Sequence, residues 1–266
     1  MIGLALEGGG SRGAYHVGVM MACLDEGYDF DGFVGTSIGA VNAAAFAQGD
    51  FLKAVDLWLG INTEKLFDPD ACKLLEIAET KWDEWDKDKI TSTRESLRRI
   101  IEENGIDTSI IKNLIDRTID EKKLRASGHD YGLVTVSLSE RRPYEMFLED
   151  IEQGKLTQYI AASACVPGFQ TVVIDDNSFV DGALYNSCPI NMLIKKGYTD
   201  IIAVRTKAPG VFRKVTAPEG VNITMVVPKH DLGNPLVFSM EKIALNIEHG
   251  YQDWKTAAGK LKPKNL

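Results

Sequence analysis

The fold is decided by residues 2–49, which read IGLALEGGGSRGAYHVGVMMACLDEGYDFDGFVGTSIGAVNAAAFAQG. An apolar run at 2–6 ends in a glycine-rich loop at 8–13, and apolar residues then recur at helical spacing up to Gly27. A second apolar stretch at 30–34 leads into another glycine turn and an alanine-rich segment. Two successive strand, turn and helix units predict an α/β fold with a parallel sheet.

The rest of the chain is interpreted from the same patterns. Residues 50–125 carry dense mixed charge and apolar residues at helical spacing, which predict a helical insert rather than an independent domain. Further strands are predicted at 131–137, 171–174, 201–205 and 223–227. A helix over 236–250 and a basic tail are expected to follow. We therefore expect one domain over 1–266, with an insert or cap at 50–125 and a C-terminal tail at 251–266.

The composition excludes several classes of protein. A chain of 266 residues that is 44% hydrophobic can bury a large core and is not disordered. Its net charge of −8 argues against nucleic acid as the main partner, although a membrane surface stays open because local basic patches can coexist with a negative total. The first residues show neither the basic segment nor the long apolar segment of a secretory leader, and no apolar run reaches eighteen residues, so we expect neither a leader nor a transmembrane helix.

The four cysteines indicate the compartment. Cys23, Cys72, Cys165 and Cys188 are widely spaced, with no Cys-x-x-Cys pair and no His or Cys cluster at zinc spacing. Widely spaced cysteines of this kind are typical of reduced, mostly buried thiols in a cytoplasmic protein. We therefore expect a cytoplasmic location and no structural zinc.

Ser37 is the candidate nucleophile. It occupies the centre of Gly35-Thr36-Ser37-Ile38-Gly39, a Gly-x-Ser-x-Gly motif between a predicted strand and a predicted helix. The sharp turn forces the serine into a strained conformation and exposes its hydroxyl, while Gly35 and Gly39 let the strand and the helix approach each other. The helix N-terminus favours developing negative charge. A Gly-x-Ser-x-Gly sequence also occurs by chance in chains of this length. The prediction therefore depends on the predicted strand before it and the predicted helix after it.

The glycine loop at 8–13 has two interpretations. Its backbone N–H groups are suited to an oxyanion hole, which stabilises the tetrahedral intermediate of acyl transfer. The same residues fit Gly-x-Gly-x-x-Gly, the pyrophosphate-binding pattern of dinucleotide enzymes, which needs an acid about twenty residues further on. Asp31 has that spacing but precedes the second strand instead of ending it. The oxyanion interpretation uses both glycine motifs, and we favour it.

A serine nucleophile also needs a general base. The histidines are His16, His129, His230 and His249, and none has a sequence context that marks it as catalytic. Asp181 is the better candidate, because it follows two apolar residues and precedes Gly182, which places it at a strand end. Partial desolvation beside the serine would raise its basicity. A triad that adds His230 or His249 in α/β-hydrolase order is the alternative.

Taken together, these motifs resemble those of the patatin-like phospholipases, in the same order and at similar separations. The matching residues are the loop at 8–13, the serine motif at 35–39, the block at 161–169, Asp181-Gly182-Ala183, Asn186 and Pro189. They span residues 2–190, and the set is specific in a way that no single motif is. One departure is Ala183, where many members have a second glycine.

The resemblance implies a three-layer α/β/α sandwich with a mostly parallel central sheet. It implies a Ser37–Asp181 dyad without histidine, and an oxyanion hole formed by the N–H groups of Gly8, Gly9 and Gly10, with Arg12 helping to hold the loop. The implied reaction is hydrolysis of acyl esters of phospholipids, lysophospholipids or other lipids, with no metal or other cofactor.

The sequence leaves two questions undecided: whether residues outside the site contact lipid, and which of the competing functions the protein has. Trp82 and Trp85 of the insert and the basic tail (Lys255, Lys260, Lys262 and Lys264) are candidates for peripheral contact with a membrane, although packing and solvation are the commoner roles of such residues. The alternatives to a lipid hydrolase are a dinucleotide-dependent enzyme and a catalytically silent lipid-binding protein on the same fold. The oligomeric state is not predicted.

Overall fold

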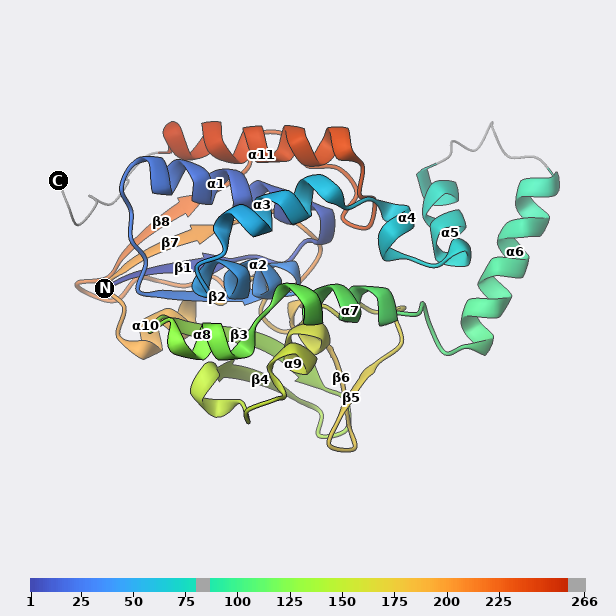
Figure 1. The fold of residues 1–266 in the computed structure, drawn as a ribbon, viewed down its shortest axis with the longest axis horizontal. Helices are drawn as coiled ribbons and strands as arrows, with labels where there is room; N and C mark the ends of the chain where they lie inside the picture. The colour runs from blue at the N-terminus through green and yellow to red at the C-terminus, as the bar shows by residue number, and fades with distance from the viewer. Residues whose placement is uncertain (80–86, 258–266) are drawn as a thin grey trace.

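The centre of the molecule is a mixed β-sheet (Figure 1). In the computed structural model, which describes residues 1–79 and 87–257, the sheet has eight strands in the order β5-β6-β3-β2-β1-β7-β8, with β4 pairing with β3. The strands are β1 (Ile2–Leu6), β2 (Gly32–Thr36), β3 (Asp130–Ser137), β4 (Arg142–Phe147), β5 (Val172–Ile174), β6 (Asn177–Asp181), β7 (Asp200–Val204) and β8 (Asn222–Val226). The five strands from β3 to β8 along this order are parallel, and β4, β5 and β6 pair antiparallel. The predicted mostly parallel α/β sheet is confirmed.

Helices cover both faces of the sheet, so the molecule has three layers. Along β1, Leu4 and Leu6 belong to a large apolar cluster with helices on one face, whereas Ala5 belongs to a second cluster with the helix on the other face. The first layer contains α1 (Ala14–Asp25), α2 (Ile38–Ala47), α9 (Leu156–Ser163) and α11 (Met240–Lys255), and the second contains α10 (Ile190–Lys196). Successive side chains along each strand therefore point alternately into the two hydrophobic cores.

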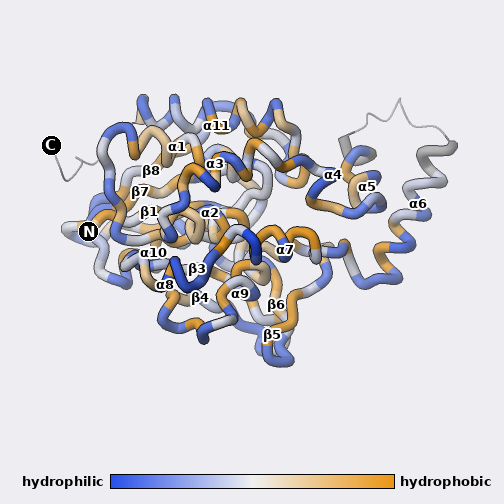
Figure 2. The backbone as a smooth tube through the Cα atoms, in the orientation of Figure 1, coloured by the Kyte–Doolittle hydropathy of each residue, from blue (hydrophilic) through white to orange (hydrophobic). Residues whose placement is uncertain are grey.

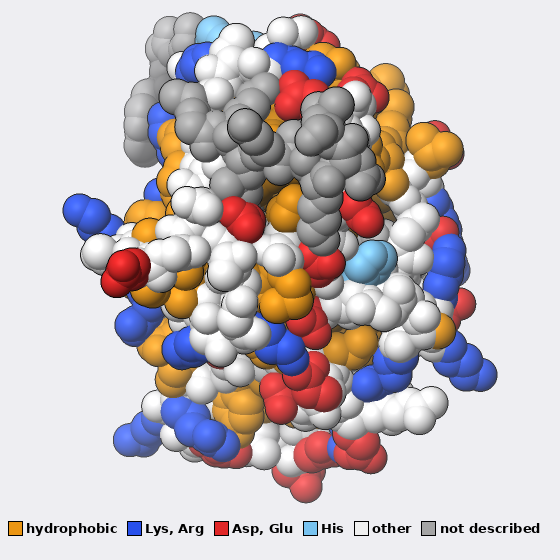
Figure 3. All heavy atoms as spheres, turned by 90° about the vertical axis from the view of Figure 1, so that its left-hand side faces the viewer, with side chains coloured by type: hydrophobic (Ala, Val, Ile, Leu, Met, Phe, Trp, Pro, Cys, Tyr) orange, Lys and Arg blue, Asp and Glu red, His pale blue; other side chains and the backbone are white. Residues whose placement is uncertain are grey.

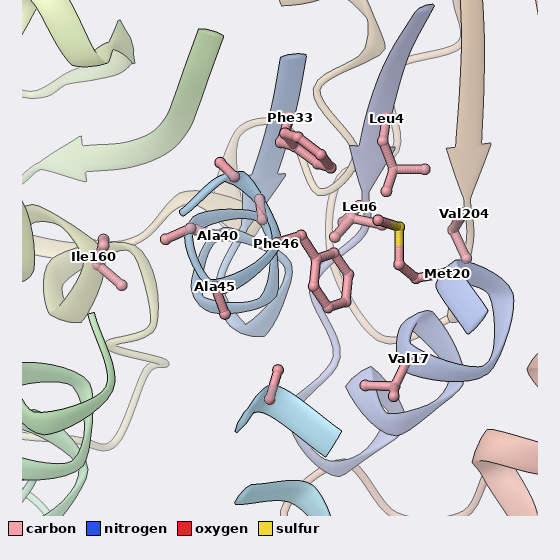
Figure 4. Packing of buried hydrophobic residues seen from close by; sticks show 14 of the residues in the cluster. Leu4, Leu6, Val17, Met20, Phe33, Ala40, Ala45, Phe46, Ile160 and Val204 are labelled. Atoms are coloured by element: carbon pink, nitrogen blue, oxygen red, sulfur yellow. The ribbon is translucent and has the colours of Figure 1, made fainter. Parts of the chain in front are cut away.

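The larger core fixes the turns that follow β1 and β2. Figure 4 shows Leu4, Leu6 and Phe33 of the strands pointing toward Met20 of α1 and Phe46 of α2. In Figure 2 the hydrophobic colour gathers in the interior around α2, and hydrophilic residues lie mainly at the periphery. Because both helices are buried along most of their length, their N-termini are fixed relative to the ends of β1 and β2.

The segment at 50–125 is helical in the structure. It contains α3 (Phe51–Gly60), α4 (Thr63–Leu66), α5 (Pro69–Glu79), α6 (Lys87–Glu102), α7 (Ser109–Thr118) and α8 (Glu121–Ala126). Trp58 of α3 and Ile115 of α7 are buried in the larger core, whereas α5 and α6 pack on each other and extend from the body (Figure 1). Trp82 and Trp85 lie outside the described residues.

The chain closes differently from the expectation. The last helix begins at Met240 and ends at Lys255, so residues 236–239 form a loop instead of the first turn of a helix. Lys260, Lys262 and Lys264 lie outside the residues that the structure describes. On the face seen in Figure 3, acidic and basic side chains are interspersed. Over residues 1–79 and 87–257, no helix is both long and apolar enough to span a bilayer.

Candidate active site

Ser37 lies on the turn between β2 and α2. Its φ of 57° and ψ of −130° fall in a region that residues with a side chain rarely adopt. The backbones cross closely here, because a Cβ on Gly39 would lie 2.3 Å from the carbonyl oxygen of Leu6 and one on Gly35 would lie 2.2 Å from the carbonyl carbon of Gly39. The two motif glycines are therefore required sterically, as the sequence predicts.

A buried serine supports the strained turn. The N–H of Ser37 donates to Oγ of Ser163 at 2.9 Å, and this hydroxyl donates to the carbonyl of Val134 at 2.6 Å. Ser163 is fully buried, at 0% exposure. It ends α9, and no local pattern indicates a role for it, although it belongs to the block at 161–169 that the resemblance includes. Its hydroxyl therefore links α9 to the turn at Ser37 and to β3.

Asp181 ends β6, as the Asp-Gly pattern predicts. Its N–H donates to the carbonyl of Cys165 at 2.8 Å, and its Oδ1 accepts the N–H of Ala183 at 2.7 Å. The alanine at this position therefore contributes a backbone donor that does not depend on its side chain. Gly182 lies against β3, since a Cβ there would lie 2.1 Å from the carbonyl oxygen of Val134. These contacts fix the carboxylate at the carboxyl end of the sheet.

The carboxyl of Asp181 is buried, with 1% of the residue exposed. Burial raises its pKa to about 6, while the Ser37 hydroxyl and the Ala183 N–H lower the pKa by stabilising the carboxylate. Oδ2 has no hydrogen bond of ordinary geometry among the described residues. The serine and the carboxylate are thus close enough to interact but not yet well aligned, as is common in sites without substrate.

The glycine loop follows β1 and begins the short helix η1 (Gly10–Gly13). Gly10 has a φ of 53°, and a Cβ there would lie 2.0 Å from the carbonyl oxygen of Pro235. The N–H of Gly8 donates to the carbonyl of Ser187 at 2.9 Å. The N–H groups of Gly9 and Gly10 have no protein acceptor within the described part of the chain. An anion at this loop would therefore meet two free donors rather than three.

Two charged side chains fix the loop from behind. Arg12 donates from Nε to the carbonyl of Gly233 at 2.8 Å and from Nη1 to the carbonyls of Thr206 and Lys207 at 3.2 and 2.8 Å. Glu7, at 1% exposure, accepts the backbone N–H groups of Thr206 and Lys207. The sequence analysis predicts this role for Arg12 but not for Glu7. The only feature that marks Glu7 in the sequence is its position as an acidic residue between an apolar strand and a glycine loop.

Two neighbouring spaces, an inner pocket and an outer cleft, both have Ser37 in their lining. The inner pocket has a volume of about 100 Å³ and is lined by apolar side chains that include Trp58, Leu114 and Phe238. The outer cleft has a volume of about 430 Å³, and Ser37 and Asp181 both line it, together with Gly9 and Gly10. Ser37, Asp181 and the two glycines with free N–H groups therefore border one cleft.

The histidines have other surroundings. His16 is fully buried beside Asn42, and burial lowers its pKa to about 3. Nδ1 of His129 lies 2.7 Å from the carbonyl oxygen of Ala47. The rings of His230 and His249 stack on each other at 4.3 Å. None of these four side chains lines the inner pocket or the outer cleft.

Neither the dinucleotide pattern nor a metal site finds further support. Oδ2 of Asp31 accepts the N–H of Ile2 at 2.6 Å, which places this acid at the start of β1, at the opposite end of the strand from the glycine loop. Over residues 1–79 and 87–257, no three His, Cys, Asp or Glu side chains come together as a metal site would require.

Comparisons with known proteins give the following matches. A family model described as patatin-like phospholipase matches residues 4–194. A patatin-like phospholipase domain-containing protein of Caenorhabditis elegans is 51% identical over 47 residues, which are 18% of this chain and 4% of the relative. An uncharacterized NTE family protein of Mycobacterium bovis is 46% identical over 48 residues, which are 18% of this chain and 13% of the relative.

Among solved structures, VipD from Legionella pneumophila superposes with a TM-score of 0.54 and 12% identity. The superposition covers 95% of this chain and 66% of VipD. At this identity the likeness concerns the fold alone. It agrees with the three-layer architecture described above. This chain matches a small part of the length of the curated relatives.

Proposed function

Because the chain belongs to the patatin-like phospholipase family, we propose that it hydrolyses carboxylic esters of lipids with Ser37 as nucleophile and Asp181 as general base. The observation that carries the proposal is the pairing in one cleft of a serine on a strained turn and a buried carboxylate whose pKa is raised to about 6. A base with this pKa is stronger than an exposed aspartate and is still ionised at neutral pH.

The proposed first half-reaction forms an acyl-enzyme. Oδ2 of Asp181 accepts the proton of the Ser37 hydroxyl while Oγ bonds to the ester carbonyl carbon. The carbonyl oxygen becomes an oxyanion, which the N–H groups of Gly9 and Gly10 stabilise. The tetrahedral intermediate then breaks its bond to the leaving oxygen, and the departing alcohol takes the proton from Asp181.

The second half-reaction uses the same groups with water. Asp181 accepts a proton from a water molecule, whose oxygen attacks the acyl carbonyl carbon. The bond between that carbon and Oγ of Ser37 breaks, and the serine takes the proton back from Asp181. The products are a fatty acid and the free enzyme. Gly8 contributes to the oxyanion hole only if its N–H leaves the carbonyl of Ser187, so the proposed hole contains two donors.

Turnover of a panel of phospholipids, lysophospholipids and acyl esters by the wild type and matched variants tests the proposal. Ser37→Ala and Asp181→Asn should each lower kcat by at least about 10³-fold, because each removes one member of a unit that acts together. His230→Ala and His249→Ala should retain turnover, since neither ring lines the cleft. Loss of turnover in one histidine variant would replace the dyad with a triad.

The alternatives predict other results. A catalytically silent lipid-binding protein would be folded and would bind lipid but would hydrolyse no ester of the panel. A dinucleotide enzyme would bind a nicotinamide or flavin cofactor, and its activity would persist in Ser37→Ala. Either outcome would contradict a serine hydrolase.

A further inference from the structure

Ser37 separates two spaces of different character. Gly10, Ser37, Val166 and Leu236 border both the inner pocket and the outer cleft. An ester has two arms that meet at its carbonyl carbon, the acyl chain and the alcohol. When that carbon lies at Oγ of Ser37, each arm must extend into one of the two spaces.

The inner pocket offers apolar surface. Its polar side chains besides Ser37 are Asn42 and Thr118, and both are already hydrogen-bonded within the protein. Nδ2 of Asn42 donates to the carbonyl of Gly13 and its Oδ1 accepts Nε1–H of Trp58, while the Thr118 hydroxyl donates to the carbonyl of Leu114. A polar alcohol would lose its hydration there without gaining partners, whereas an acyl chain would not. The pocket therefore suits the acyl arm.

The volume of the inner pocket limits the length of that arm. Its volume is about 100 Å³. An apolar cavity of about 150 Å³ holds the six carbons of benzene, so a pocket of about 100 Å³ accommodates about four carbons. Trp58 of α3 and Leu114 and Ile115 of α7 line it, and all three pack in the larger core. A longer chain would leave part of its apolar length outside this pocket unless packed side chains moved.

The outer cleft has little charge to offer the alcohol arm. Among the residues that the structure describes, Asp181 is the only charged residue in its lining, and Asn234 is the only amide. The other side chains include Leu184, Pro167 and Pro209. A phosphate group in this cleft would lose water, would find no lysine or arginine, and would lie near a carboxylate.

We propose that the protein acts on esters of uncharged alcohols with acyl chains of about four carbons, the acyl arm lying in the inner pocket and the alcohol in the outer cleft. This inference rests on the function proposed above. It narrows the substrate from lipid esters in general to short-chain acylglycerols and esters of similar chemistry.

Two substrate series test the inference on the wild-type chain. With p-nitrophenyl esters from acetyl to palmitoyl, kcat/KM should peak near butyryl and fall at least about tenfold for lauroyl and longer chains. Between 1-butanoylglycerol and its 3-phosphate, which differ by the phosphate alone, the uncharged ester should be preferred by at least about tenfold. An optimum at decanoyl or longer, or equal turnover of the phosphate, would overturn the inference.

Matched variants separate the two spaces. Leu114→Ala should move the optimum toward longer chains and Leu114→Phe toward shorter ones, so a general loss of stability cannot produce both shifts. Leu184 is 49% exposed at the outer cleft. The ratio of kcat/KM for the uncharged ester to kcat/KM for its phosphate should be at least about threefold lower in Leu184→Arg than in Leu184→Gln. The chain-length optimum should be the same in both variants. Unchanged profiles in both pairs would overturn the assignment of the two arms.

The experiment also distinguishes failure of the inference from failure of the proposed function. If the folded protein hydrolyses no ester of either series and a fluorophosphonate does not label Ser37, the proposed function is wrong and the inference fails with it. If esters are hydrolysed with Ser37 labelled but the chain-length and phosphate preferences are absent, the inference alone is overturned.

Discussion

Replacing Asp181 with asparagine should change how the stability of the protein depends on pH. The side chain is buried, and burial raises its pKa from 3.8 to about 6. Below about pH 4 the carboxyl is protonated in the folded and unfolded chains, so it does not affect their balance. Above about pH 6 it is ionised in both, and the buried charge opposes folding. The wild type should therefore lose about 2 kcal/mol of unfolding free energy between about pH 4 and pH 6, and about 3 kcal/mol over the complete titration, from well below pH 4 to well above pH 6.

Urea denaturation of the wild type and Asp181→Asn, at several pH values between about 4 and 7, measures this loss. The amide does not titrate, so any constant cost of burying it cancels when the pH dependences are compared. The unfolding free energy of the variant should rise relative to that of the wild type by about 2 to 3 kcal/mol from the acid to the neutral end.

Asp176→Asn is the matched control, because this aspartate lies exposed in the turn between β5 and β6. It should not reproduce the relative gain of the buried variant. If the difference in unfolding free energy between the wild type and Asp181→Asn stays constant within about 0.5 kcal/mol across this pH range, the carboxyl is not desolvated. The argument for its basicity then fails.

Other perturbations probe the rest of the site. Ester turnover should rise as the pH increases through about 6, because the buried carboxylate must be ionised to accept a proton; a profile that is flat from about pH 5 to pH 8 would contradict this role. Ser163→Ala leaves the buried N–H of Ser37 without its acceptor, so urea denaturation should show a loss of about 1 to 3 kcal/mol, accompanied by a lower kcat. Gly39→Ala should cost about 3 kcal/mol or more, because its Cβ would lie 2.3 Å from the carbonyl oxygen of Leu6, and the yield of folded protein reports this loss. Arg12→Lys cannot reproduce the three carbonyl contacts of the guanidinium, so kcat should fall while a tryptophan fluorescence melt stays cooperative.

The parts of the fold that follow local patterns could be predicted from the sequence. The turn at Ser37 is an example, because its two glycines and the flanking apolar runs lie within a few residues of each other. The position of Asp181 at a strand end follows from neighbouring residues in the same way. Strand β4 has no such signal: it contains Pro143 and charged residues and pairs with β3 alone, so it lacks an alternating apolar pattern.

The contacts that support the site join residues far apart in the chain, and no local pattern predicts them. Ser163 reaches the N–H of Ser37 across 126 residues, and Glu7 reaches Thr206 across 199. The predicted oxyanion donors illustrate the same limit. The glycines mark the loop, but the partner that occupies the N–H of Gly8 comes from a carbonyl beyond β6. The inner pocket likewise exists because α3 and α7 pack beside the glycine turns.

The central claim is that Ser37 is an activated nucleophile, and covalent labelling tests it most directly. The folded wild type should react with a fluorophosphonate, and mass spectrometry of the peptides should place the adduct on Ser37. Labelling should be absent from Ser37→Ala and strongly slowed in Asp181→Asn, because the carboxylate accepts the serine proton. An unlabelled wild type that unfolds cooperatively, or an adduct on another residue, would contradict the account.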